Sequence, residues 1–298
     1  MNSQPARSAI LAGIGLMLIG IFFFALNDAL GKWLIATYSV GQLLLVRSIA
    51  GLVFLVPFIK REGWGAFKEA PRPLIQLARP FFATFEVACF YWALAYMPLA
   101  DVMTFYLAGP IYVTAMSPFL LREKVGWRRM LAVAAGFGGV LIALSPSMTA
   151  LTPPAFVAIA GSVSFSILMI CTRLVRGTSD VVLITTQTVG ALLFGAVAAP
   201  FTWVALGWRD TALLIVLGVT AMVAHMCINR SLKLAPASVV VPYQYTTIVW
   251  AIILGYLIFH DEPGAAMLAG AGTIIAAGLY IFIREQARAK PPAFSDPP

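Results

Sequence analysis

Residues 89–139 read CFYWALAYMPLADVMTFYLAGPIYVTAMSPFLLREKVGWRRMLAVAAGFGG. One apolar segment in this stretch ends at a proline, a second begins at once and ends on the acidic Glu123, and a third segment rich in Gly and Ala follows. A degenerate copy at residues 227–278 has the same order and places Glu262 at the corresponding point. Repeats of this length in an apolar chain indicate a duplicated helical unit.

The composition indicates that a membrane rather than water surrounds most of the chain. Hydrophobic residues make up 61% of the 298 residues and charged residues 11%, and the mean hydropathy is +0.91. An average soluble domain has roughly 25% charged residues. A water-soluble fold this apolar would expose large hydrophobic patches. We therefore expect an all-α polytopic membrane protein with the lipid bilayer as a partner.

Apolar runs of about 20 residues, the length that a helix needs to cross a bilayer, recur along the whole chain. The first run follows Arg7 and continues to Ile35, which is too long for the core of a signal peptide, so we expect it to remain as a membrane span. The ten expected spans are residues 10–34, 41–59, 74–96, 99–121, 127–145, 154–174, 181–203, 211–232, 237–259 and 265–283.

Spans one to five and six to ten are expected to be two copies of one unit, at residues 1–150 and 151–290, followed by a disordered tail at 291–298. Residues 47–54 align with residues 187–194 in spans two and seven. The aligned pairs in spans one and six are Phe24 with Phe165 and Lys32 with Arg173. Because each copy has an odd number of spans, the second enters the membrane from the opposite side. Inverted repeats of this kind are typical of secondary transporters, in which the substrate site lies near mid-membrane between the halves.

The distribution of basic residues indicates an orientation and excludes a nucleic-acid partner. The net charge is +8, but most Lys and Arg residues, Arg79 included, are assigned to short segments at one end of the expected bundle. By the positive-inside rule, this end and both termini are expected on the cytoplasmic side of a bacterial-type inner membrane.

The sequence has no motif for a cofactor, a metal or enzyme chemistry. The cysteines Cys89, Cys171 and Cys227 have no pairing or metal-ligand spacing, and no Walker loop is present. We therefore expect no cofactor, no metal ligand and no catalytic residue. Transport would be facilitated or driven by an ion or substrate gradient rather than by ATP.

The arrangement of these features resembles the drug/metabolite transporter superfamily. The resemblance is carried by the five-plus-five spans, Arg47 in span two, the proline and small residue that begin spans four and nine, and the acid that closes each of them. Over nearly the whole chain the sequence is similar to the EamA-type exporters, and its overall similarity suggests the aromatic amino-acid exporter branch. The resemblance implies a basket of helices around a central cavity and export of amino acids or related metabolites. Arg122 and Asp261 depart from the small residue that usually precedes each closing acid.

Ionisable groups inside the spans are candidate site residues because they are costly to bury in a bilayer. Asn27 and Asp28 lie in span one, where Asp28 either pairs with Lys32 one turn away or helps to recognise an amino-acid zwitterion. Arg47 either holds a substrate carboxylate by a bidentate fork or locks helices through Asp28 or Glu86. Because the resemblance includes this arginine across varied substrates, we assign it the structural role.

Two further spans each carry a polar pair on one face. Glu86 and Phe90 share a face of span three, and such a face is not expected to point at lipid. Glu86 is then either a proton-coupling carboxylate or a partner for Arg79. His225 and Asn229 in span eight either hydrogen-bond between helices or face the cavity.

Spans four and nine each contain a proline in mid-helix, Pro110 and Pro242. A proline leaves a carbonyl free one turn earlier, and this is tolerated where a cavity or a polar neighbour satisfies that carbonyl. We expect the binding region at these breaks, with Tyr106 at one and with Tyr243 and Gln244 at the other. An aromatic-lined cavity would suit apolar or aromatic side chains. The alternative is that these rings only pack between helices.

The two closing acids and the glycine-rich spans are expected to be structural. Glu123 and Glu262 open the turns into spans five and ten, where a carboxylate is stabilised by the amino-terminal end of the helix dipole. The small residues of these spans allow close helix packing or dimerisation, so the protein is expected to be a monomer or a homodimer.

These features predict a secondary-type inner-membrane transporter that exports amino acids, aromatic ones included, and related small-molecule substrates by alternating access. A multidrug or quaternary-cation exporter is the alternative within transport, and it would need an acid such as Asp28 or Glu86 facing an aromatic cavity. A membrane-embedded enzyme or a lipid flippase is the alternative from another class.

Overall fold

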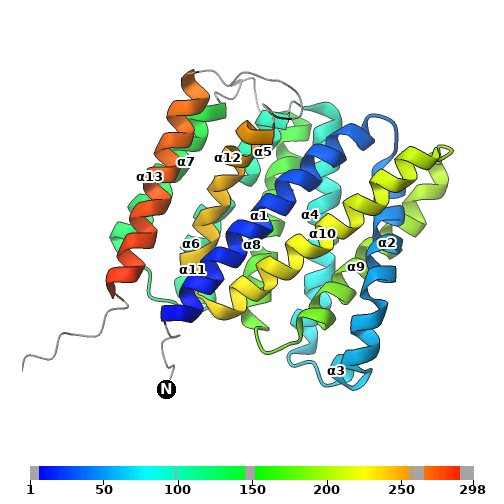
Figure 1. Ribbon diagram of the computed structural model, residues 1–298, viewed down its shortest axis with the longest axis horizontal. Coiled ribbons are helices and arrows are strands. Elements are labelled where there is room, and N and C mark those ends of the chain that lie inside the picture. The colour runs from blue at the N-terminus through cyan, green and yellow to red at the C-terminus, as the bar shows by residue number, and fades with distance from the viewer. Residues whose placement is uncertain (1–6, 98, 145–151, 255–256, 258–264, 289–298) are drawn as a thin grey trace, which may run out of the picture.

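The protein is a bundle of helices in the computed structural model, which describes residues 7–97, 99–144, 152–254, 257 and 265–288 (Figure 1). These residues contain no strand. The helices of the first half are α1 (Arg7–Ile35), α2 (Val40–Glu62), α3 (Gly65–Lys68), α4 (Pro73–Tyr96), α5 (Leu99–Tyr106), α6 (Gly109–Leu120) and α7 (Trp127–Leu144). Those of the second half are α8 (Pro153–Leu174), α9 (Asp180–Ala198), η1 (Ala199–Thr202), α10 (Trp208–Leu234), α11 (Ala237–Val240), η2 (Val241–Thr246), α12 (Thr247–Leu254) and α13 (Ala265–Arg288). Glu262 and the tail at 291–298 lie outside the described residues.

Six helical segments of the described chain are long and apolar enough to cross a membrane. They are Ser8–Ile35, Val40–Glu62, Pro153–Leu174, Asp180–Thr202, Trp208–Leu234 and Ala237–Leu254. The apolar run of α4 is interrupted by Arg79 and Glu86, and α5 and α6 have only 8 and 12 residues. The chain is therefore a multi-pass membrane protein, whereas the expected count of ten spans does not follow from helix length and composition.

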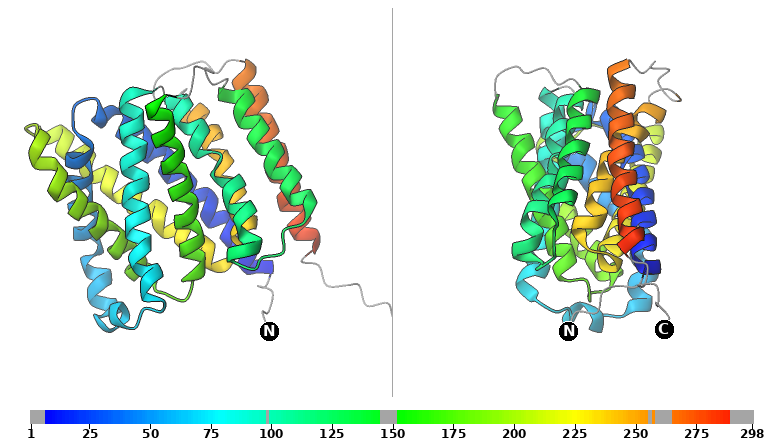
Figure 2. Two further views of the ribbon diagram at one scale, coloured as in Figure 1. Left: turned by 180° about the vertical axis from the view of Figure 1, so that it is seen from behind. Right: turned by 90° about the vertical axis from the view of Figure 1, so that its left-hand side faces the viewer.

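Helices of the first half pack mainly against helices of the second half. The most extensive helix–helix contacts join α1 to α10, α2 to α9, α4 to α8, and α7 to α13. Figure 1 shows the α7–α13 pair at one edge of the bundle, and Figure 2 shows the same pair from behind. The expected counterparts of α1, α2, α4 and α7 in the second half are α8, α9, α10 and α13. Exchanging each helix for its counterpart gives the same set of packed pairs, as a two-fold relation between the halves would produce.

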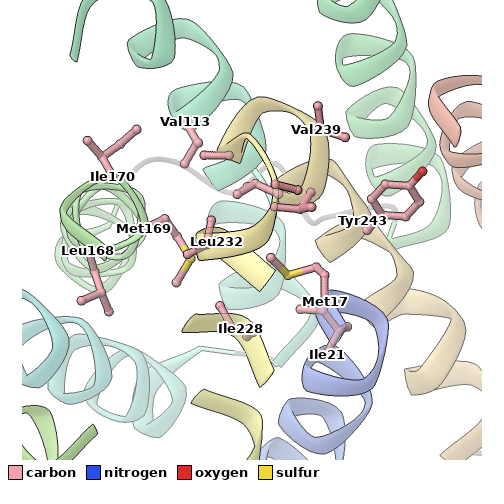
Figure 3. Packing of buried hydrophobic residues seen from close by; sticks show 14 of the residues in the cluster. Met17, Ile21, Val113, Leu168, Met169, Ile170, Ile228, Leu232, Val239 and Tyr243 are labelled. Carbon is pink, nitrogen blue, oxygen red and sulfur yellow. The ribbon is translucent and has the colours of Figure 1, made fainter. Parts of the chain in front are cut away.

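One end of the bundle is closed by a cluster of buried hydrophobic residues. We call this the N-terminal end, because α1 begins there and the short helix α3 lies there as well (Figures 1 and 2). The cluster joins α1, α8, α10 and α11 through residues that include Met17, Leu168, Ile228 and Val239 (Figure 3). Lipid tails are as apolar as these side chains, so the cluster is stabilised by van der Waals packing between the helices.

The fourth and ninth expected spans, residues 99–121 and 237–259, are not continuous α-helices. The first divides into α5 and α6, with Pro110 in the first turn of α6. The second passes from α11 through the 3-10 helix η2, whose first turn holds Pro242, into α12. Proline lacks an N–H and fits the first turn of a helix, where no partner for an N–H is available. The breaks expected at Pro110 and Pro242 are therefore present.

Two glycines permit the close helix approach around the middle of the bundle. A Cβ on Gly218 of α10 would overlap the backbone carbonyl of Arg47 on α2. A Cβ on Gly161 of α8 would overlap the hydroxyl of Tyr106 on α5. Small residues at helix contacts allow backbones to approach this closely in membranes. These two contacts fix the positions of Arg47 and Tyr106.

Candidate functional site

A cavity of about 140 Å³ lies in the middle of the bundle. Its walls come from α1, α2, α4 and α5 of the first half and from α8, α9, α10, η2 and α12 of the second. The cavity is therefore formed between the two halves. Most of the binding residues predicted from the sequence line it. They are Asn27, Asp28, Glu86, Phe90, Tyr106, His225 and Gln244.

Other predicted residues lie outside the cavity. Asn229 is one turn beyond His225 on α10, is 2% exposed and does not line the cavity. Tyr243 precedes Gln244 on η2 and belongs instead to the hydrophobic cluster at the N-terminal end (Figure 3). Pro110 and Pro242 are buried at the helix breaks and do not line the cavity either.

The charged groups of the cavity are one arginine and two carboxylates. Arg47, which was expected to be structural, lines the cavity with Asp28 and Glu86. Ion pairs in the described part of the chain join Arg173 to Glu123, and Asp180 to Lys233 and Arg230, so Arg47 forms none with either cavity carboxylate. Its guanidinium lies 5.9 Å from the centre of the Tyr91 ring.

Two ion pairs considered from the sequence are not formed. Lys32 is exposed and makes no ion pair with Asp28, and Arg79 makes none with Glu86. Both cavity carboxylates are therefore left without a cationic partner at salt-bridge distance among the described residues. Buried charges in this condition are costly, and they are stabilised when a ligand supplies the missing partner.

Asn27 is held in place by helix α10 and by an aromatic ring. Its amide Nδ2 donates to the backbone carbonyl of Leu217 at 2.8 Å and to Thr220 Oγ1 at 3.2 Å. The hydroxyl of Tyr91 donates to its Oδ1 at 3.4 Å. Because the contacts to Leu217 and Thr220 cross from the first half to the second, Asn27 fixes α1 against α10 beside the cavity.

Aromatic rings form a large part of the cavity wall. Phe90 meets Tyr106 edge to face with ring centres 5.0 Å apart, and Phe24 meets His225 in the same way at 5.0 Å. Tyr106 also donates its hydroxyl to the backbone carbonyl of Glu86 at 2.9 Å, which joins α5 to α4. The ring of Phe165 on α8 completes this apolar surface.

A polar network begins at the cavity and continues beneath it toward the N-terminal end. Gln187 Nε2 lies 3.2 Å from Nδ1 and 3.0 Å from Nε2 of His225. Gln187 Oε1 accepts a hydrogen bond of 3.3 Å from Nη2 of Arg79. Arg79 was expected among the basic residues at the membrane surface, but its side chain is fully buried. It lies six residues inside α4 and is surrounded by three helices of the second half.

Glu123 stabilises the start of a different helix from the one expected from the sequence. Its carboxylate accepts hydrogen bonds from the backbone N–H groups of Ala237 and Ser238 at 3.0 and 3.1 Å, and from the Ser238 hydroxyl at 2.8 Å. It also pairs with Arg173 at 3.3 Å. Glu123 therefore caps the start of α11 in the other half instead of the helix that follows it in sequence. Arg122, with a φ of 55°, makes the turn that precedes it.

Several cavity residues were not among the predicted site residues, and the repeat alignment contained the signal for some of them. Gln187 stands at the position aligned with Arg47, and Phe165 at the position aligned with Phe24, and all four line the cavity. Corresponding positions of two related halves face the same central space. The other residues missed by the sequence analysis include Tyr91, Met103, Thr188, Met222 and Thr247.

The arrangement suits recognition of charge and flat rings rather than metal ligation. No group of three or more His, Cys, Asp or Glu side chains is placed to hold a metal ion within the described ranges. The cysteines Cys89, Cys171 and Cys227 are free. A small molecule in the cavity would meet carboxylates, a guanidinium, amides and aromatic faces.

Comparison with known proteins gives a consistent classification. A family model described as the EamA-like transporter family matches residues 11–145 and again residues 152–283. The chain is 24% identical to the S-adenosylmethionine uptake transporter of Rickettsia felis, over 95% of this chain and 96% of that protein. It is 26% identical to the riboflavin transporter of Rhizobium johnstonii, over 97% of this chain and 96% of that protein.

A solved crystal structure shares the fold, with a TM-score of 0.78 over 94% of this chain and 99% of that chain at 17% identity. The two named relatives differ from the aromatic amino-acid exporter branch that the sequence suggested.

Proposed function

This chain belongs to the EamA-like transporter family, and on that premise we propose that it is a secondary transporter of small metabolites that carry an amino-acid headgroup and a flat ring. The aromatic amino acids predicted from the sequence belong to this class. S-adenosylmethionine, which the Rickettsia relative is named for, belongs to it as well, because the molecule combines an α-amino acid, a sulfonium cation and an adenine ring.

The observation that carries the proposal is the combination of charges and rings in the cavity. Arg47 can hold a substrate carboxylate through two parallel hydrogen bonds. Asp28 and Glu86 can receive the ammonium group and any further cation. The faces of Phe90, Tyr106 and the other cavity rings suit a planar substrate ring and stabilise a nearby cation.

The charge count of the cavity favours a cationic substrate within this class. The cavity residues include two carboxyl groups and one arginine, so acidic groups outnumber basic ones. A carboxylate without a counter-ion in the membrane interior is stabilised by a cation that the substrate supplies in addition to its amino-acid headgroup. S-adenosylmethionine supplies such a cation through its sulfonium, whereas phenylalanine has no net charge. We therefore rank S-adenosylmethionine above neutral amino acids.

Transport is proposed to follow alternating access between the two halves. The cavity volume of about 140 Å³ is below the roughly 300–1,000 Å³ of pockets for drug-sized ligands, so substrate binding requires the halves to separate at one end. Inverted halves that rock about a central site expose it first to one side and then to the other. We place the chain in a bacterial inner membrane with both termini in the cytoplasm. The substrate and ion gradients then set whether it imports or exports.

The test is transport by the purified protein in liposomes. Labelled S-adenosylmethionine, L-phenylalanine, riboflavin and the cation tetraphenylphosphonium are compared with and without a pH gradient. The proposal expects saturable transport of S-adenosylmethionine, slower transport of phenylalanine, and little movement of riboflavin, which has the ring but no amino-acid group. Movement of riboflavin alone, or of none of the four, would refute the proposed substrate class.

A multidrug or quaternary-cation exporter is the second candidate. The specific observation in its favour is that Asp28 and Glu86, without a cationic partner, face an aromatic cavity. Such an exporter has no need of Arg47, which repels cations. Fast tetraphenylphosphonium movement without S-adenosylmethionine transport would establish this alternative and exclude the favoured one.

A further inference from the structure

Arg79 of α4 is a fully buried cation whose role the cavity alone does not explain. Its guanidinium donates to Thr172 Oγ1 at 2.9 Å, to the Leu183 carbonyl at 3.1 Å, to Gln187 Oε1 at 3.3 Å and to Asn229 Oδ1 at 3.4 Å. All four acceptors are neutral and belong to the second half. No carboxylate of the described residues makes an ion pair with it.

Hydrogen-bond donors outnumber acceptors around this guanidinium. The amide Nδ2 of Asn229 is buried beside it and has no hydrogen-bond partner among the described residues. The nearest acid along α9 is Asp180, one turn before Leu183. Lys233 already holds it at 2.6 Å and Arg230 lies 3.7 Å from it. A buried cation with a spare amide donor beside it is an arrangement that an incoming carboxylate would satisfy.

The position of Arg79 links the central cavity to the surface of the N-terminal end. On the cavity side, its partner Gln187 also contacts His225. On the other side, Asp180 and Lys233 line a surface hollow of about 640 Å³, together with Arg176, Arg230 and the acids Glu62 and Glu69. We call this path the α4–α9–α10 seam and define it by Gln187, His225, Arg79, Asn229, Asp180 and Lys233.

The six residues that define the seam are all polar, unlike those of the hydrophobic cluster at the same end of the bundle. His225, Asn229 and Lys233 follow one another at intervals of four residues, so they share one face of α10. Ionisable residues this deep in a membrane bundle are costly and mark transport pathways. The cost is difficult to explain as helix packing alone, because hydrophobic residues of the same size would close the seam at lower cost.

We propose that Arg79 is a second anion-binding residue of the transport path, which takes over the substrate carboxylate from Arg47 when the N-terminal end opens along the seam. The proposal rests on the proposed function in one respect, that the substrate has a carboxylate. In the conformation described, Arg79 instead binds the four neutral acceptors and holds the two halves together. The carboxylate replaces Gln187 and Asn229 as partners and also satisfies the spare amide donor.

The first test measures selectivity for a carboxylate in liposomes. S-adenosylmethionine is compared with decarboxylated S-adenosylmethionine, which keeps the sulfonium and the adenine ring. Arg79→Gln is expected to slow S-adenosylmethionine by about tenfold or more, the scale of one lost charged hydrogen bond, and the decarboxylated compound by much less. Equal slowing of both compounds, or of neither, would show that Arg79 only joins the halves.

A second variant tests the proposal even if Arg79→Gln does not fold. Asn229→Asp keeps the arginine and the shape of its neighbour, and it supplies a permanent carboxylate beside Arg79. We expect it to reduce S-adenosylmethionine transport at least as selectively as Arg79→Gln, with a melting temperature no lower than wild type. Unchanged transport in the folded Asn229→Asp variant would contradict the proposal.

The third test does not require a known substrate, so it separates failure of this inference from failure of the proposed function. In a cysteine-free background, Arg79→Cys and the matched core variant Leu168→Cys are treated with an anionic, membrane-impermeant methanethiosulfonate. The reagent is added to the vesicle face that exposes an amino-terminal tag. The inference expects labelling of Arg79→Cys and none of Leu168→Cys. Equal protection of both positions overturns it, whether or not wild type carries S-adenosylmethionine.

Discussion

Replacing Glu123 with alanine should destabilise the junction between the two halves of the bundle. The carboxylate accepts three hydrogen bonds from the start of α11 and pairs with Arg173. The side chains of Arg173 and Glu123 are only 9% and 11% exposed. Alanine would leave two helix N–H groups without partners. It would also leave the nearly buried Arg173 without its carboxylate, with only the carbonyls of Leu232 and Lys233 as acceptors. Breaking a buried pair in this way costs roughly 3–5 kcal/mol.

The expected loss can be measured as a shift in melting temperature in detergent. For a chain of this size, 1 kcal/mol corresponds to about 2 °C, so Glu123→Ala should melt about 6–10 °C below wild type. Glu123→Gln keeps one acceptor oxygen and should lose about 1–3 kcal/mol. Lys124→Gln changes an exposed neighbour on the same turn and serves as the control, with no shift expected. A Glu123→Ala protein that melts within about 1 °C of the control would refute the assignment of this residue as the α11 cap.

Three further predictions concern packing, charge selectivity and pH. Gly218→Ala should displace Arg47 and reduce the transport rate at least about tenfold, because the new Cβ would overlap the Arg47 carbonyl. Gly272→Ala is the control and should transport at the wild-type rate, because a Cβ there meets nothing within 4 Å. Equal transport rates in the two variants would contradict the contact between Gly218 and Arg47. Glu86→Gln removes one of two cavity carboxylates and should shift the ratio of S-adenosylmethionine to phenylalanine transport toward phenylalanine by about tenfold; an unchanged ratio would remove Glu86 from substrate recognition. The hydrogen bond that Tyr38 donates to Asp210 at 2.6 Å raises the pKa of the Tyr38 phenol above its ordinary value. A raised folded-state pKa gives stability that is present below the ordinary value of about 10 and is lost as pH rises through the folded pKa. Wild type should therefore have a higher melting temperature than Tyr38→Phe at neutral pH, and this difference should become smaller above about pH 10. A difference in melting temperature that is constant across this range would contradict the hydrogen bond between Tyr38 and Asp210.

Much of the site was accessible from the sequence because polar residues are rare in membrane helices. Asp28, Glu86 and His225 could be singled out on this ground alone, and all three line the cavity. The alignment of the two halves also pairs Arg47 with Gln187, and both of these residues line the cavity.

The remaining features depend on contacts between distant helices. The sequence shows which face of a helix is polar, but not which neighbour that face meets. Arg79 was assigned to the membrane surface, because its depth inside the bundle follows from helices more than 90 residues away, through Thr172 and Leu183. Glu123 caps a helix 114 residues further along the chain. Gln244 and Tyr243 are adjacent in sequence, and only the 3-10 geometry of η2 decides which of them faces the cavity.

The central claim is that the cavity between the halves binds a substrate with an amino-acid headgroup, and equilibrium binding of labelled S-adenosylmethionine to the purified protein tests it most directly. The variants to compare are Arg47→Gln, in the cavity, and Arg128→Gln, an exposed arginine beside Trp127. We predict saturable binding to wild type and to Arg128→Gln, weakened about tenfold or more in a folded Arg47→Gln protein. Binding that is equal in all three proteins, or absent from wild type, would contradict the claim.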